Sequence, residues 1–78
     1  MLVDLLVEKA GVPIAAIEIK SSAKISGAHL SGLHAFSSDY PHVPSYVVST
    51  SENPVTLNGV KVLPWRLFLQ DLPKIIAG

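Results

Sequence analysis

Three charged side chains near the amino terminus, Asp4, Glu18 and Lys20, have types and a spacing that could support chemistry. Glu18 and Lys20 lie two residues apart in the run AIEIKSS (residues 16–22), which otherwise holds only alanine, isoleucine and serine. Residues two apart in a strand face the same side. Because burying a charge pair costs free energy unless something compensates it, a cation bound between the two acids would explain the arrangement.

Two short strands must position these charges. Residues 2–8 and 13–20 are rich in valine, isoleucine and leucine and flank Gly11, which predicts a β-hairpin. If Gly11 is the tip of a three-residue loop, Asp4 lies directly opposite Glu18, close enough for both carboxylates to hold one metal ion. The three charges then share one face. The other face carries no charge and is expected to form a core wall under a helix: Val3, Leu5, Val7, Ala15, Ile17 and Ile19.

A helix is predicted after the hairpin. Leu30, Leu33 and Phe36 recur at a spacing of three, which is typical of a helix with one apolar face. Ser26 is the expected N-cap, and Pro41 is expected to stop the helix.

The remaining elements are short strands and a final helix. Residues 44–50 are predicted to form a strand, and Asn58-Gly59 is a strong hairpin turn signal between two β-prone pieces. Residues 65–76 are predicted to form a helix that ends or kinks at Pro73. One face of this helix is expected to carry Trp65, Leu69 and Leu72. Trp65, with Phe68 and Leu69, is expected to act as a lid on the core and not as a platform for stacking bases.

Composition limits the number of domains and the kinds of partner that the chain can be expected to have. The chain has 78 residues, which predicts a single domain, and it contains no cysteine. Hydrophobic residues make up 49% and charged residues 15%, an excess that favours self-association, and the formal net charge of zero gives no broad basic field for nucleic acid. Neither a signal peptide nor an apolar run of membrane-spanning length is apparent, so we expect a cytoplasmic protein without a membrane partner.

Four motifs occur in an order that resembles a known family. They are Val3-Asp4-Leu5, the run from Ile17 to Ser22, LSGLHAF at residues 30–36 and LPWRLFL at residues 63–69. In this order, over residues 2–72, they resemble the PD-(D/E)XK nuclease superfamily. The resemblance is closer still to the nuclease-like domain of unknown function found C-terminal to AAA-type ATPases of bacteria and archaea.

The resemblance implies a fold and a site. The fold would be a small mixed α/β sheet of order β-β-α-β-β-β-α, a restriction-endonuclease-like core without its first helix and strand. Asp4, Glu18 and the backbone carbonyl of Ile19, whose side chain would point into the core, would hold Mg²⁺ or Mn²⁺. Lys20 would orient the attacking water and offset charge in phosphodiester cleavage. Nucleic acid and an ATPase would be the partners.

Departures from the family pattern leave alternatives open. Without the preceding helix and strand, residues 2–8 would form an unpaired sheet edge, so we expect either a piece of a longer ATPase-linked protein or a homodimer whose second subunit completes the sheet. The chain contains no phosphate-binding loop motif of its own. The alternative functions are a catalytically silent oligomerisation or protein-interaction domain and a fragment with no independent role. In either case the three charges would form a plain surface salt-bridge cluster.

Overall fold

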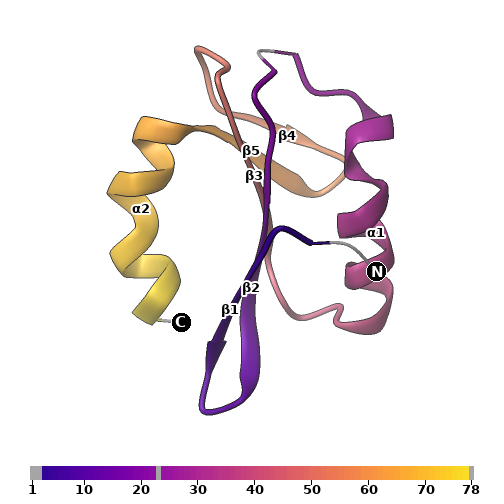
Figure 1. The fold of residues 1–78 in the computed structure, drawn as a ribbon, viewed down its shortest axis with the longest axis vertical. Coiled ribbons are helices and arrows are strands. Elements are labelled where there is room, and N and C mark those ends of the chain that lie inside the picture. Colours follow the sequence, from indigo (N-terminus) through magenta and orange to yellow (C-terminus); the bar gives the residue numbers. More distant parts are fainter. Residues whose placement is uncertain (1–2, 23, 78) are drawn as a thin grey trace.

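The structure, a computed structural model, describes residues 3–22 and 24–77, without the side chains of residues 28 and 29. A five-stranded sheet runs through the middle of the molecule, and one helix covers each of its faces (Figure 1). The order of elements confirms the prediction from sequence. The elements are β1 (Leu5–Lys9), β2 (Val12–Ile19), the 3-10 helix η1 (Gly27–Leu30), α1 (Ser31–Asp39), β3 (Ser45–Ser49), β4 (Val55–Leu57), β5 (Val60–Pro64) and α2 (Trp65–Ala77).

The sheet has the strand order β1-β2-β3-β5-β4. Strands β2, β3 and β5 are parallel to one another, whereas the two hairpins, β1–β2 and β4–β5, are antiparallel. Because β1 pairs only with β2, it lies at an edge of the sheet, as expected. The three parallel strands therefore form the centre, where both faces are buried and the strands read as apolar runs.

The first hairpin has the predicted pairing but a different turn. Leu5 pairs with Ile17, as expected. The loop, however, has two residues and not three: Ala10 and Gly11 both have positive φ angles, 53° and 78°. Ile14 has no partner in β1 and forms a bulge that shifts the pairing by one residue. Beyond the bulge, the pairing is therefore the one predicted. The second hairpin turns at Asn58-Gly59, as predicted.

Both faces of the sheet are covered, which corrects the expectation of one core wall and one charged face. Ala15 and Ile17 of β2 pack under α2, and Ala16, between them, is fully buried under α1. Val3 lies with the α1 cluster and not on the wall expected from alternation, because the chain bends at Asp4, before β1 begins. The charged part of the α1 face is therefore confined to its end, beyond Ala16.

Helix α1 has the predicted apolar face but a different start. Leu33 and Phe36 are buried against the sheet, and the helix ends at Asp39, two residues before Pro41, as predicted. The N-cap position is Leu30, which makes no side-chain capping bond, so Ser26 is not the N-cap of α1. The sequence GAHL forms a 3-10 turn between that serine and the helix.

Helix α2 differs from the prediction in its buried face. Phe68 is buried, in agreement with its expected place in the lid over the core, and Ile75 is buried with it. Leu72 packs beside them, a spacing of four and three residues, whereas Trp65 and Leu69 are half exposed. The helix also continues past Pro73 to Ala77, so the proline does not end it. Burial of Ile75 after the proline offsets part of the cost of the missing backbone hydrogen bond.

Candidate functional site at the carboxyl ends of the parallel strands

The carboxyl ends of β2, β3 and β5 meet at one end of the sheet. The three strands are adjacent and parallel, so the chain leaves all of them at this end, the upper end in Figure 1. Ligands of open α/β sheets generally bind just beyond the carboxyl ends of parallel strands. All three charges singled out from the sequence lie at this end.

Glu18, the penultimate residue of β2, has a nearly buried carboxylate. It pairs in register with Val47 of β3, which is fully buried, and only 8% of its own surface is exposed. Alternation places it on the same face as Ala16, the face that α1 covers. A carboxylate so well covered loses hydration that its neighbours must replace.

Asp4 reaches this region from outside the ladder. The prediction placed it directly opposite Glu18, but the pairing of β1 with β2 stops at Leu5 and Ile17, and Asp4 lies in the preceding bend. There its Oδ2 atom accepts a hydrogen bond of 2.8 Å from the backbone N–H of Ile19. The aspartate thus satisfies a backbone donor that has no strand partner, and it remains next to Glu18.

Lys20 completes the group of charges. Its Nζ lies 3.6 Å from Oε1 of Glu18, and its backbone N–H donates to the carbonyl of Val48 in β3. The side chain is 35% exposed, so its ammonium remains accessible to solvent. The predicted convergence of Asp4, Glu18 and Lys20 is therefore present.

The surroundings of Glu18 raise the pKa of its carboxyl group, because the nearby positive charge does not compensate for burial and for the neighbouring acid. Burial raises its pKa above the ordinary value, and repulsion from Asp4 raises it further. Lys20 lowers the pKa by its charge and its hydrogen bond without cancelling the rise. A second cation near the two carboxylates would relieve the repulsion.

The oxygen donors at this position suit a hard divalent cation with few protein ligands. Oε1 of Glu18 contacts Lys20 and Oδ2 of Asp4 accepts from Ile19, and the two carboxyl groups are also within hydrogen-bonding range of each other. The carbonyl of Ile19 belongs to a residue whose N–H points toward Asp4, and both groups of a strand residue face the same side. Among the described residues no group of three His, Cys, Asp or Glu side chains could hold a metal ion. Mg²⁺ needs no such cage, since it commonly binds one or two carboxylates and keeps several waters.

The side chain of Ile19 differs from the prediction. It was expected to point into the core, but it is 53% exposed. It lies on the face of α2, beyond the part of the sheet that the helix covers.

Two serines, one at the end of β3 and one just after it, extend the site and were not singled out from the sequence. Ser49, the last residue of β3, is 2% exposed and pairs with Pro64 of β5. Its Oγ lies 2.7 Å from Oγ of Ser51, whose backbone N–H also donates to it. The backbone bond from Lys20 to Val48 and the pairing of Ser49 with Pro64 form a row that connects the charges with the end of β5.

A pocket of about 360 Å³ lies at the end of this row. Trp65 contributes to it with half of its surface exposed, which corrects its predicted role as a lid on the core. The guanidinium carbon of Arg66 lies 5.4 Å from the centre of the indole ring. The sequence did contain a signal for this pocket: an aromatic residue and an arginine, Trp65 and Arg66, directly follow a predicted strand. The pocket is lined by Thr50, Ser51, Glu52, Pro64, Trp65 and Arg66.

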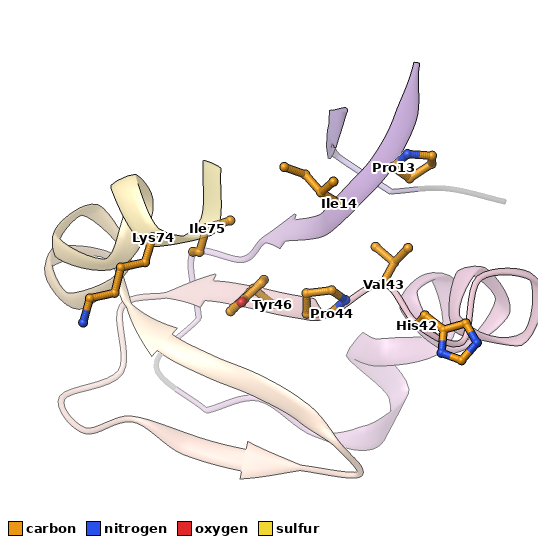
Figure 2. A pocket seen from close by; sticks show the side chains of 8 residues that line it. All are labelled: Pro13, Ile14, His42, Val43, Pro44, Tyr46, Lys74 and Ile75. Atoms are coloured by element: carbon orange, nitrogen blue, oxygen red, sulfur yellow. The ribbon is translucent and has the colours of Figure 1, made fainter. Parts of the chain in front are cut away.

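A second pocket, of about 260 Å³, lies at the opposite end of the parallel strands (Figure 2). Pro13, Ile14 and Pro44 form much of its wall, and its lining includes no carboxylate. Figure 2 shows Lys74 and His42 at opposite ends of the group. Nothing in this lining resembles the charges around Glu18.

A family model matches most of the chain. Residues 3–68 match the domain of unknown function (DUF4143), close to the range over which the four motifs occur. Comparison with curated proteins and with solved structures gave no significant match. Within the described residues, neither helix is long and apolar enough to cross a membrane.

Proposed function

Because this chain belongs to the DUF4143 family, for which the match itself assigns no activity, we propose from its site that it is a nuclease-like module that binds a divalent metal ion and acts on phosphodiesters. The observation that carries the proposal is the approach of Asp4, Glu18 and Lys20 at the carboxyl end of β2. Two carboxylates and one ammonium are also the site residues that the resemblance to the PD-(D/E)XK superfamily implies.

The metal ligands in this proposal are Asp4, Glu18 and the carbonyl of Ile19. Bound Mg²⁺ or Mn²⁺ would polarise the phosphate and lower the pKa of a coordinated water. Asp4 has a second task, since it also fixes the backbone of Ile19 through the 2.8 Å hydrogen bond. The same contact therefore holds the carbonyl and the carboxylate in place together.

Lys20 is the proposed catalytic cation. Its ammonium is held 3.6 Å from Glu18 and is partly exposed, so it can contact both a phosphate oxygen and the attacking water. In that position it orients the water and offsets negative charge that grows on the phosphate. Loss of this charge would leave metal binding in place but slow cleavage.

Thermal unfolding with increasing Mg²⁺ or Mn²⁺ tests the metal site. A ligand that binds only the folded state raises the midpoint in proportion to the logarithm of its concentration over its dissociation constant. We expect stabilisation of the wild-type chain, its loss in Glu18→Ala, and its retention in the matched control Glu8→Gln, which changes an exposed carboxylate near the first turn. Equal responses of the three proteins would reject the site.

A second candidate function is self-association without catalysis, and the exposed apolar surface favours it. Leu5 and Ile19 of the first hairpin and three residues of α2 are each about half exposed on the α2 side of the molecule. Strand β1 is also an open edge that another strand could pair with. The residues on α2 are Trp65, Leu69 and Ile76.

Light scattering separates the two functions. A dimeric mass at micromolar concentration that becomes monomeric in Leu69→Glu, with no response to metal, would support the interaction domain. A monomer that is stabilised by metal would support the nuclease-like module. An ATPase partner stays a prediction of the resemblance.

A further inference from the structure

We propose that the pocket formed by Trp65 and Arg66 is a subsite for an unpaired nucleobase, next to the phosphodiester held at Glu18. The inference rests on the proposed function and adds to it a preference for single-stranded nucleic acid. It starts from the half-exposed indole ring of Trp65, which the core of the protein leaves uncovered.

The indole and the guanidinium make a combination suited to nucleic acid. An exposed aromatic ring offers a stacking surface to any base, and a neighbouring arginine supplies positive charge. Arg66 lies 5.4 Å from the ring centre, so both groups act at the same place. The pocket beside them, about 360 Å³, is large enough for a base.

The other lining residues determine which part of a nucleotide enters. Glu52 contributes a carboxylate, which repels a phosphate, so the pocket suits the uncharged base. The hydroxyls of Thr50 and Ser51 can donate to or accept from base edges. The phosphates would lie outside the pocket, toward Arg66 and Lys20.

The distance between the pocket and the charges fits a short piece of one strand. Strand β3 separates β2 from β5, so the ends of these two strands lie about 10 Å apart, two strand spacings. Glu18 faces α1 whereas Trp65 begins α2 on the other face, so a bound strand must also cross the end of the sheet. Stacked nucleotides advance about 3.4 Å each, so at least three nucleotides are needed to reach from Glu18 to the pocket. A base flipped into the pocket must be unpaired, which disfavours duplex substrates.

Intrinsic fluorescence tests the subsite directly, because Trp65 is the single tryptophan of the chain. The probe is a single-stranded DNA 12-mer of mixed sequence, added to the full chain in EDTA. We expect quenching by the single strand, weaker quenching by its duplex, and none by a 12-mer of abasic residues. Fluorescence unchanged by all three would overturn the subsite.

Substitutions give the size of the effect. By anisotropy of a labelled 12-mer we expect Trp65→Leu to bind about 5- to 150-fold more weakly, the range typical of one base–aromatic stack, and Trp65→Phe to retain most of the binding. Arg66→Gln should lower the slope of log affinity against log salt by about one. Leu69→Ala, an exposed change on the same helix, is the matched control. Equal affinity of Trp65→Leu and wild type would reject the proposal.

The same experiment separates the subsite from the proposed function. If Glu18→Gln keeps the quenching in EDTA while metal leaves the wild type unaffected, the subsite stands and the metal site fails. If metal stabilises the wild type but oligonucleotides leave Trp65 unquenched, the metal site stands and the subsite fails. Fluorescence that changes only with protein concentration would assign this surface to a protein contact and overturn the subsite.

Discussion

The two ends of the parallel strands carry different side chains although the same three strands form both. At the carboxyl ends lie Asp4, Glu18 and Lys20, with the pocket of Trp65 beside them. At the amino ends, prolines and aliphatic side chains, together with His42, Tyr46 and Lys74, line the pocket of Figure 2, which has no carboxylate in its lining. Under the proposed function the carboxyl ends serve binding, the usual place for ligands in α/β sheets, and the amino ends serve stability.

The largest expected effect is on cleavage of nucleic acid. Lys20→Ala should lower Mn²⁺-dependent cleavage of single-stranded DNA about 100- to 1,000-fold, the usual cost of removing one group that stabilises transition-state charge. Lys74→Ala, which removes an ammonium at the amino ends, should leave the rate unchanged. The measurement is a gel assay with labelled substrate. Equal losses in both variants would remove the distinction between the two ends.

A smaller effect is expected from the hydrogen bond of Asp4. Asp4→Ala removes the acceptor of the Ile19 N–H and should destabilise the chain by about 1 kcal/mol, a typical net value for one hydrogen bond. Asp4→Asn keeps an acceptor oxygen and relieves repulsion with Glu18, so it should be more stable than Asp4→Ala. Urea unfolding followed by circular dichroism gives both values. If Asp4→Asn were the less stable of the two, the hydrogen bond would not be the important contact.

A comparable but opposite change is expected at Glu18. Its charge is nearly buried beside another carboxylate, and its pKa is raised, first by burial and then by Asp4. Glu18→Gln should therefore raise the unfolding midpoint at neutral pH in EDTA by a few degrees, while it abolishes stabilisation by metal. Stability sacrificed at one residue is typical of functional sites. A lower midpoint in this variant would show that the ion pair with Lys20 outweighs the burial of charge.

The smallest effect concerns pH at the amino ends. Burial, and then the charge of Asp71, raise the pKa of Tyr46 above its ordinary value of 10.0. The neutral phenol is therefore favoured in the folded state, so its contribution to stability is complete below pH 10 and is lost as the pH rises through the folded pKa. Tyr46→Phe should show a weaker loss of stability above pH 10 in urea unfolding. Identical pH dependence in both proteins would contradict this role.

The element order, the pairing of Leu5 with Ile17 and the convergence of the three charges were predictable because each depends on local signals. Alternation, Gly11 and Asn58-Gly59 specify hairpins within a few residues. The predicted pairing is correct although the predicted loop is one residue too long, because a bulge compensates for the shorter turn. Local patterns therefore carried most of the fold.

The buried face of α2 could not be predicted because its apolar arc is wider than the core needs. Phe68, Leu72 and Ile75 are on one side of the arc, and Trp65 and Leu69 are on the other. Periodicity reveals the whole arc, but the docking position on Tyr46, Val48 and Leu63 selects which side is buried. The exposure of Trp65, and with it the second pocket of the site, follows from this long-range choice.

The central claim is that Asp4 and Glu18 bind one divalent cation, and paramagnetic line broadening by Mn²⁺ tests it most directly. In ¹H–¹⁵N spectra of the full chain, with Mg²⁺ as the diamagnetic reference, substoichiometric Mn²⁺ should broaden the amide signals of Asp4, Ile19 and Lys20 first. The signal of Glu8, near the first turn, should stay sharp. Uniform broadening, or broadening centred on Glu52 or Asp71, would contradict the account.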